Sequence, residues 1–374
     1  MILTNCAACA APLGLASGKK CGRCSTRYCG PECQVQHWKE GGHDQLCKKI
    51  KKGGGAEQYH ADKKYKEAVT VAVEKCAEDT KGQTCFICTQ ALHWKTKEGL
   101  VRGCACRGTA GFAHVSCLAE QAKILVAEAL ENNLDDKVKD ERWKRWSTCS
   151  LCEQHYHGVV CCALGWACWK TYLGRPEGHW TRRNAMNLLG SGLSKAKLQE
   201  DALSVGEAEL AMERRLGADE DSILITQGNL ATIYRELGLH EKALRLRRDV
   251  YFGFLKLNGE DHRDTLIAAN NYAMNLLDLR RFKEAKRVLR KVIPVALRVL
   301  GAEHNLTLSL REDLCRATLC GDSSANERRD ALKMLEDTLG VMRRVLGPQH
   351  PTTQRVQQCL CSYREQFWSR VRDR

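Results

Sequence analysis

The chain has 374 residues, of which 43% are hydrophobic and 22 are cysteines. This length predicts two or three domains, and no stretch is long and apolar enough to cross a bilayer. The formal charge of +14 raises the question of a nucleic-acid partner. Basic residues are not interleaved with stacking aromatic residues in the cysteine-rich part, so that class of partner is disfavoured.

Cysteine and histidine residues form two ladders of eight between Cys6 and Cys152, each with seven cysteines and one histidine in paired spacing. Tetrahedral zinc prefers thiolate and imidazole ligands, and a CxxC or CxC pair places two sulfurs on one tight turn. We therefore expect about four structural zinc ions. The expected ligands are Cys6, Cys9, Cys21, Cys24, Cys29, Cys33, His43, Cys47, Cys85, Cys88, Cys104, Cys106, His114, Cys117, Cys149 and Cys152.

A disulfide framework is the alternative, because the number of cysteines is even. The start of the chain has no early charge and no uninterrupted apolar core, so it is not typical of a secretory signal. We expect an intracellular protein with reduced thiols, in the cytoplasm rather than the nucleus. The basic run KKIKK (48–52) resembles a nuclear address, but such runs are more often a solvated face.

Residues 6–47 resemble a MYND zinc finger, and the run TRYCGPECQVQHWKEGGHDQLC is the most diagnostic part. The resemblance covers all eight ligands and implies two interleaved sites. One is formed by Cys6, Cys9, Cys29 and Cys33, and the other by Cys21, Cys24, His43 and Cys47.

The same resemblance implies that the finger binds short proline-containing peptides near Gln36 and Trp38. The alternative for Trp38 is that it packs the small core. His37 lies in an expected helix over 31–40. We assign it to the surface, because His43 gives the expected spacing to Cys47.

The glycine-rich run KKIKKGGG (48–55) predicts a hinge, and a helix is expected over 56–78. Residues 51–80 are accordingly expected to form a basic hinge and helix linker. They separate an N-terminal domain, residues 1–50, from a second zinc domain, residues 81–178.

The second ladder contains a CxC pair followed by the run CRGTAGFAHVSCL. These features resemble the RING-CH family, the RING variant found in a group of ubiquitin ligases. A PHD finger has the same ligand order, but the CxC pair, the RG after it and the wide gap before the last pair favour RING-CH. The implied sites are Cys85, Cys88, His114 and Cys117, and Cys104, Cys106, Cys149 and Cys152.

The RING-CH resemblance implies a soluble ubiquitin ligase that acts by proximity and has no covalent catalytic residue. A ubiquitin-conjugating enzyme is expected to dock at Ile87, Ser150 and Leu151, although Ile87 and Leu151 could instead only shield the metals.

Three features depart from the RING-CH pattern. Gln121 stands where many members have a Trp, and Glu153 stands where a basic residue often follows the last ligand. A charged, helical insertion separates Cys117 from Cys149. Trp143 or Trp146 at its end is a candidate for the missing aromatic contact, with core packing as the alternative.

From about Trp180 the chain repeats itself, and glycines recur at matching turns roughly 42 to 46 residues apart. Each unit predicts a helix pair whose apolar faces are buried only by stacking, as in a solenoid. Runs such as LGPQHPTT and NLATIYRELGLHEKALRLRRDV resemble the tetratricopeptide repeats of kinesin light chains. The resemblance covers about residues 182–353 within an expected repeat domain, residues 179–374.

The repeats carry candidate ligand-binding residues. Asn229, Asn270 and Asn271 on the first helices are expected to clamp a peptide backbone, or else to be solvated. The second helices carry a basic face, which we interpret as solvated; an acidic ligand is implied if that face lines the groove. Its members are Arg245, Arg247, Arg248, Lys286, Arg287, Arg290 and Lys291.

Histidines recur in the turns between repeats. His262, His304 and His350 share one repeat position, where the first repeat has Glu220. Because glutamate replaces histidine there, we assign the position to turn chemistry rather than to a metal.

The sequence thus predicts a mainly α protein with two small cross-braced zinc modules followed by an α-solenoid of tetratricopeptide-like helix pairs. The leading function is ubiquitin ligation, in which the middle domain recruits a conjugating enzyme and the flanking modules choose substrate. The alternative is a non-enzymatic adaptor whose zinc modules and repeats only bind proteins.

Overall fold

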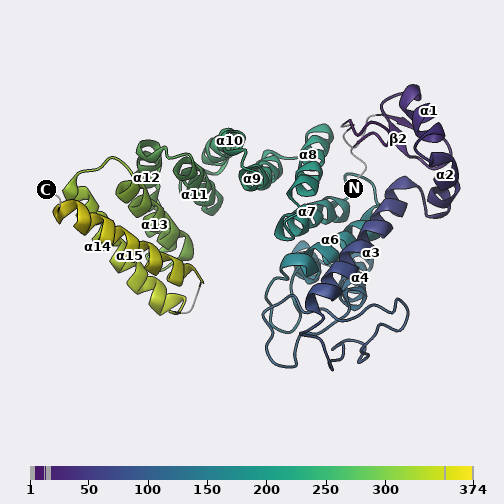
Figure 1. The fold of residues 1–374 in the computed structure, drawn as a ribbon, viewed down its shortest axis with the longest axis horizontal. Coiled ribbons are helices and arrows are strands. Elements are labelled where there is room, and N and C mark those ends of the chain that lie inside the picture. Colours follow the sequence, from purple (N-terminus) through teal and green to yellow (C-terminus); the bar gives the residue numbers. More distant parts are fainter. Residues whose placement is uncertain (1–4, 12, 14–17, 349–350, 373–374) are drawn as a thin grey trace. The chain divides into compact units, whose positions relative to one another are not determined.

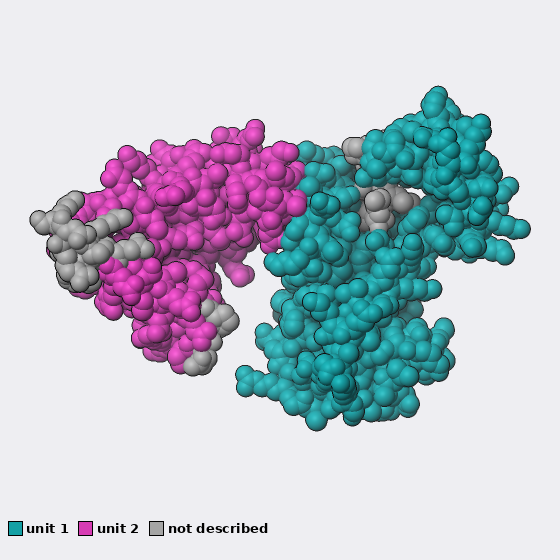
Figure 2. All heavy atoms as spheres, in the orientation of Figure 1, with its two compact units in different colours: residues 1–218 teal, residues 219–374 magenta. Residues whose placement is uncertain are grey.

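The computed structural model describes residues 5–11, 13, 18–348 and 351–372, and most of these residues are helical (Figure 1). The expected mainly α fold with an N-terminal zinc-binding region and a helical-repeat part is confirmed. The chain divides into two compact units, Met1–Ala218 and Asp219–Arg374 (Figure 2). Each unit is described by itself.

Unit 1 begins with a two-stranded antiparallel sheet, in which Lys19 pairs with Tyr28 and Lys20 with Arg27. Its elements are β1 (Lys19–Lys20), β2 (Arg27–Tyr28), α1 (Pro31–Lys39), α2 (His43–Lys52), α3 (Ala56–Cys76), α4 (Val115–Glu131), α5 (Asp136–Trp143), the 3₁₀ turn η1 (Lys144–Trp146), α6 (Gly158–Tyr172), α7 (Trp180–Lys195) and α8 (Gln199–Leu216).

The run KKIKKGGG, where the sequence predicts a hinge, forms a helix end and a turn. KKIKK belongs to α2, because Ile50 is buried and holds this end of the helix against the finger. Gly54 and Gly55 adopt positive φ angles of 86° and 95°, which glycine adopts without strain. The Gly55 N–H donates to Ile50 O at 3.0 Å, and the Ala56 N–H donates to Cys24 O at 2.8 Å.

Helix α3 lies where the sequence predicts a helix, and it packs on α6. Lys170 on α6 pairs with Asp62 at 3.1 Å and lies 4.3 Å from the centre of the Tyr65 ring. Tyr65 also hydrogen-bonds Ser116 on α4 at 3.1 Å. Helix α3 therefore fastens the second cysteine ladder to the helices that follow it.

Helices α6 and α7 approach closely because glycines remove side chains at their contact. A Cβ atom on Gly165 would lie 3.1 Å from Leu189 Cα, and one on Gly192 would lie 2.9 Å from Cys161 O. This contact binds α7 and α8 to unit 1, so the two compact units divide well after the start of the repeats. Within the described residues, no helix is long and apolar enough to cross a membrane.

The described part of unit 2 contains three helix pairs and a last helix, arranged as stacked repeats (Figure 1). Its core is built from apolar side chains on both helices of each pair, with Ala269, Leu276, Leu289 and Leu310 fully buried. Its helices are α9 (Glu220–Glu236), α10 (His240–Asn258), α11 (Arg263–Asp278), α12 (Phe282–Leu300), α13 (Asn305–Cys320), α14 (Ala325–Val345) and α15 (Pro351–Arg372).

The recurring turn histidines cap helices, as expected of turn chemistry. His262 Nδ1 accepts the Asp264 N–H at 3.3 Å, and His304 Nδ1 accepts the Leu306 N–H at 3.1 Å. Each bond satisfies a donor that the first turn of a helix leaves unpaired. His350 lies outside the described residues.

The glycine contact between α6 and α7 yields a prediction. Gly192→Ala should destabilise these helices by about 1–3 kcal/mol, because the added methyl group meets backbone that cannot give way. Gly190→Ala is the matched control, since its Cβ would meet only Val205 Cγ1 at 3.5 Å. Hydrogen exchange of the α6 and α7 amides in the full chain measures both variants. Equal protection in the two variants would show that the close approach is not a constraint.

Candidate metal centres

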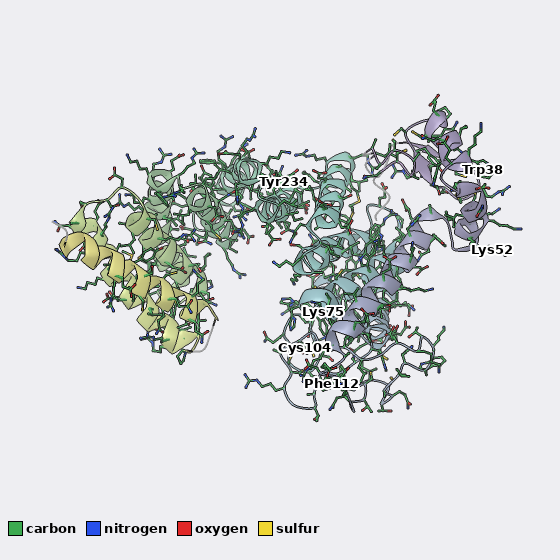
Figure 3. All side chains as sticks on the ribbon, viewed as in Figure 1. Trp38, Lys52, Lys75, Cys104, Phe112 and Tyr234 are labelled. Atoms are coloured by element: carbon green, nitrogen blue, oxygen red, sulfur yellow. The ribbon has the colours of Figure 1, made fainter. Side chains whose placement is uncertain are left out.

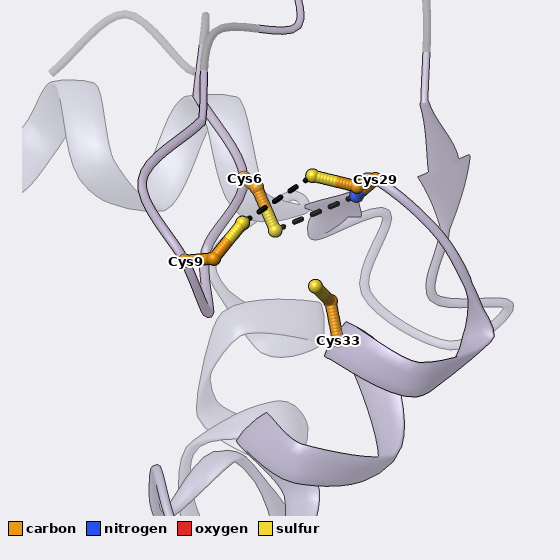
Figure 4. A group of neighbouring side chains, drawn as sticks. All are labelled: Cys6, Cys9, Cys29 and Cys33. Carbon is orange, nitrogen blue, oxygen red and sulfur yellow. Dashed lines mark hydrogen bonds between the residues drawn. The ribbon is translucent and has the colours of Figure 1, made fainter.

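The sixteen ladder residues, all of them described, come together in four groups, and the donor atoms of each group lie within 4.8 Å of one another. Figure 4 shows the first group, in which Cys6 and Cys9 from one loop lie opposite Cys29 and Cys33, the latter on α1. The groups are those that the two resemblances imply. They are Cys6, Cys9, Cys29 and Cys33; Cys21, Cys24, His43 and Cys47; Cys85, Cys88, His114 and Cys117; and Cys104, Cys106, Cys149 and Cys152.

The donor spacing suits zinc rather than disulfides. Four sulfurs at about 2.3 Å from a tetrahedral ion are about 3.8 Å apart. Cys21 Sγ and Cys47 Sγ are 3.8 Å apart, and so are Cys106 Sγ and Cys149 Sγ. A disulfide requires about 2.05 Å, and every cysteine of the ladders is a free thiol. The four groups therefore fit structural zinc.

The charge state of the first group also calls for a cation. Burial raises the pKa of the Cys6 thiol, but hydrogen bonds from backbone groups of Cys9, Cys29 and Ala8 outweigh it and lower the pKa to about 6. Hydrogen bonding to Cys9 and Cys6, together with repulsion from them, raises the pKa of Cys29 to about 12. A negative charge on one sulfur thus disfavours a negative charge on the next. A bound divalent ion neutralises this repulsion.

The two ligand histidines present different ring nitrogens. His43 is fully buried, and its Nε2 lies 3.4 Å from Cys24 Sγ. His114 turns its Nδ1 toward Cys88 Sγ and Cys117 Sγ, at 3.3 and 3.6 Å. The other nitrogen of His114 lies 3.3 Å from Ala91 O, which fixes the tautomer. Burial lowers the pKa of both rings, which favours the neutral form that metals bind.

His37 is half-buried, which corrects its assignment to the surface. Its Nδ1 lies 3.0 Å from the hydroxyl of Tyr28, and its ring stacks on His43 with centroids 5.1 Å apart. Trp38, labelled in Figure 3, packs its ring edgewise against the same ligand at 5.7 Å. His37 lies outside the four groups and holds the ligand His43 in place.

The expected peptide site of the finger is solvent-accessible. Trp38 is 41% exposed. Part of its ring packs against His43 in the small core, and the rest is accessible to solvent. Gln36 is exposed and donates to Glu40 at 3.3 Å. Val35 and Leu46 are also exposed on α1 and α2, and sequence reasoning did not single them out.

The expected docking residues of the second module lie beside the ligands. Ile87 and Leu151 are 37% and 52% exposed, and Ser150 is half-buried. The two apolar residues have matching local geometry. The Ile87 N–H donates to Cys85 Sγ, and the Leu151 N–H donates to Cys149 Sγ, each at 3.4 Å.

The departures from the RING-CH pattern are visible around this module. Glu153 pairs with Arg145 at 3.0 Å, and Gln121 is half-buried on α4. Trp146 is only 1% exposed, so it packs the core. Trp143 is engaged with the rings of Tyr172 and Trp180, at 5.4 and 5.3 Å.

Sequence reasoning missed the most exposed large apolar side chain of the described residues, which is Trp94, 69% exposed. Trp94 lies in the run LHWKTK (92–97), which follows the first CxxC pair of the second ladder, Cys85 and Cys88. The available signal was an aromatic residue between polar ones in a segment without a predicted helix.

The asparagines of the repeats differ in exposure. Asn229 on α9 is exposed, Asn271 on α11 is half-buried, and Asn270 is only 8% exposed. The buried Oδ1 of Asn270 has no hydrogen-bond partner among the described residues. Of these three, Asn229 and Asn271 are therefore open to a bound peptide.

Two cations of the expected solvated face are buried, which corrects that interpretation for them. Arg247 on α10 is 4% exposed and donates to Asn271 O and to Thr232 Oγ1. Lys286 on α12 is 8% exposed and donates to Asp322 O and Ser323 Oγ at 3.2 and 3.0 Å. These side chains link neighbouring helices.

Comparison with known proteins identifies two kinds of module. Residues 6–47 match the family model of the MYND finger, and residues 222–298 and 323–352 match models of the tetratricopeptide repeat. No curated protein matches the chain. The modules found are protein-interaction modules, and the repeats imply peptide or protein partners.

Similar solved structures include two of a putative kinesin light chain of Podosopora anserina with nearly identical TPR-like repeats, one of which carries a single substitution. Each is 18% identical and covers 62% of this chain and 97% of its own, with TM-scores of 0.42 for the substituted protein and 0.41 for the other. BtubC (BKLC) from P. vanneervenii is 15% identical and covers 69% of this chain and 92% of its own, with a TM-score of 0.35.

The donor geometry yields a prediction about metal content. The purified full chain should carry about four zinc ions, and chelation should unfold the two ladders while the repeat helices persist, because binding energy here is folding energy. Elemental analysis and hydrogen exchange measure the two effects. Two or fewer ions in well-folded protein would contradict the prediction.

A matched pair of cysteine variants tests the third group. Cys85→Ser should lose one zinc and the protection of the loops around it, because three ligands remain. Cys76→Ser should keep all four ions, since this buried thiol lies outside the groups and its sulfur contacts Arg102 O at 3.7 Å. Loss of zinc from both variants would indicate general unfolding instead.

Proposed function

We propose that the chain is a RING-type ubiquitin ligase in which residues 85–152 recruit a ubiquitin-conjugating enzyme. One observation carries the proposal. Two zinc loops each present an exposed apolar residue, Ile87 or Leu151, fixed by the same N–H to sulfur bond. The resemblance of this segment to RING-CH supports the same function.

The proposed mechanism relies on proximity. The module holds the charged conjugating enzyme beside a substrate lysine, and a well-oriented intramolecular attack gains several orders of magnitude in effective concentration. The zinc ions contribute rigidity. Because Ile87 and Leu151 lie between paired ligands, they lose little freedom on binding, and their apolar surface contributes directly to affinity.

The proposal assigns the zinc ligands and domains as expected from the sequence. The ligands are the sixteen residues of the four groups. The domains are a MYND finger (1–50), a connecting segment (51–80), a RING-CH domain (81–178) and a repeat domain (179–374). Thiolate ligands require a compartment in which cysteines stay reduced, so the proposed activity is intracellular.

The flanking modules are proposed to select substrate. A proline-containing segment would lie across the finger at Gln36 and Trp38, where the open face of the indole offers an apolar platform. In the repeats, the exposed amide of Asn229 and the half-buried amide of Asn271 would bind peptide backbone. Asn270 would instead support these residues from inside the helix pair.

A non-enzymatic adaptor is the second candidate, and the residue after the last ligand favours it. Glu153 places a carboxylate where related domains often carry a cation, and Arg145 neutralises that carboxylate at 3.0 Å. In this alternative both zinc modules bind partner proteins without ubiquitin transfer.

Substitutions in the two zinc loops separate these functions. Ile87→Ala or Leu151→Ala should abolish auto-ubiquitination while all zinc is retained, because truncating a central apolar anchor costs about 2 kcal/mol or more of binding. The assay uses the full chain with a panel of conjugating enzymes. Ile225→Ala, at a similarly exposed isoleucine on α9, is the matched control and should stay active.

His114→Ala completes the experiment, since it should lose metal and activity together. If Ile87→Ala transfers ubiquitin at the wild-type rate, the docking site lies elsewhere. If the wild-type chain is inactive with every conjugating enzyme of the panel, the adaptor function replaces the ligase.

A further inference from the structure

Trp94 lies on a turn that is closed by several hydrogen bonds. The preceding His93 is buried, and its Nδ1 accepts the Thr96 N–H at 3.1 Å and the Thr96 hydroxyl at 2.9 Å. Backbone bonds join His93 N to Glu98 O at 3.0 Å and Lys97 N to His93 O at 2.9 Å. The indole nevertheless remains 69% exposed, beside Leu92 at 59%.

The base of this turn is held from the other side as well. Glu98 turns inward and accepts the Ser116 N–H at 2.7 Å and the Ser116 hydroxyl at 2.9 Å. The turn therefore loses little conformational freedom when a partner covers it, which is the condition for an efficient aromatic anchor.

Trp94 is connected to the same zinc group as the proposed docking residue Ile87. Cys88 Sγ lies 3.3 Å from the His114 ring, which is 5.3 Å from the ring of His93, and that ring is 6.0 Å from the indole of Trp94. Ile87 lies between Cys85 and Cys88 in sequence. Both residues therefore belong to segments that meet at the third ligand group.

A patch of ordinary interface size centred on the third ligand group is large enough to include the exposed turn. A standard interface covers about 800 Å² on each partner, which corresponds to a patch with a radius of roughly 16 Å. The contacts that lead from Cys88 Sγ through the rings of His114 and His93 to the indole measure 3.3, 5.3 and 6.0 Å. A partner that covers this ligand group is therefore expected to meet the turn.

We propose that Trp94, supported by Leu92, is an anchor for the ubiquitin-conjugating enzyme and extends the docking surface beyond the zinc loops. This inference rests on the proposed ligase function. It places a large aromatic contact on the turn after the first ligand pair, where Trp94 inserts into an apolar depression of the partner.

The lysines beside Trp94 raise one other class of occupant. Lys95 and Lys97 are exposed, and an aromatic ring between cations also suits single-stranded nucleic acid. Such sites stack successive bases on several rings, whereas this turn offers one ring and the exposed aliphatic Leu92, two residues before it. A single ring with an apolar neighbour in sequence favours the protein partner.

Binding of the zinc-loaded full chain to each conjugating enzyme of the same panel tests the inference. Trp94→Ala should weaken binding at least tenfold with zinc content unchanged, and Trp94→Phe should keep most of the affinity because a ring remains. In the transfer assay the loss should fall on the half-saturating concentration of conjugating enzyme and not on the maximal rate. Phe252→Ala, at an exposed aromatic residue of α10, is the control and should bind as the wild type.

The possible failures are distinguishable. If Ile87→Ala loses binding and Trp94→Ala does not, the inference is overturned and the proposed function stands. If the wild-type chain binds no conjugating enzyme, both are overturned. A labelled oligouridylate is the second probe. If Trp94→Ala abolishes its binding without affecting the conjugating enzyme, the turn is a nucleic-acid surface and the inference is wrong.

Discussion

Metal–thiolate coordination is the constraint on which the N-terminal part of this chain depends. The buried cluster of the finger has few apolar members besides its cysteines, chiefly Tyr28, Ile50 and Ala56. So small a core does not offset the entropy of ordering the loops around it. Binding of structural zinc supplies roughly 10–16 kcal/mol in isolated finger peptides, which is as large as the whole stability of a typical domain. The fold of the loops therefore does not depend on the burial of their apolar side chains.

Exposed apolar side chains occur on the repeat helices as well, Ile225 and Phe252 among them. In a zinc loop the backbone is held by N–H to sulfur bonds and by the ion, so Ile87 and Leu151 remain exposed without loss of structure. The same reasoning applies to Trp94, whose turn is held by the buried His93. Surfaces of this kind are available to partners because the fold does not need them.

The sequence predicts the sixteen ligands and the mainly α architecture, because ligand spacing and helical periodicity are local properties. The division of the ligands into four groups is what the family resemblances imply. The sequence did not predict the contacts between segments that are distant along the chain. His43 and His114 present different ring nitrogens, and only the neighbouring carbonyl and thiolates decide which one. The glycines of KKIKKGGG suggested a hinge, yet the same residue type closes a hydrogen-bonded turn here. Arg247 and Lys286 lie on faces that look solvated, but loop and helix carbonyls inside unit 2 satisfy their charges.

Buried polar contacts also set the register of the repeats in unit 2. Thr265 donates to Phe254 O at 3.2 Å and Thr307 donates to Ala296 O at 3.4 Å, so α11 and α13 are each tied at one repeat position to the helix before. The histidine caps recur with the same period. An apolar interface alone tolerates sliding, whereas an unpaired buried hydroxyl costs about 1–3 kcal/mol and penalises every other register. Repeated polar bonds of this kind give adjacent helix pairs one defined packing.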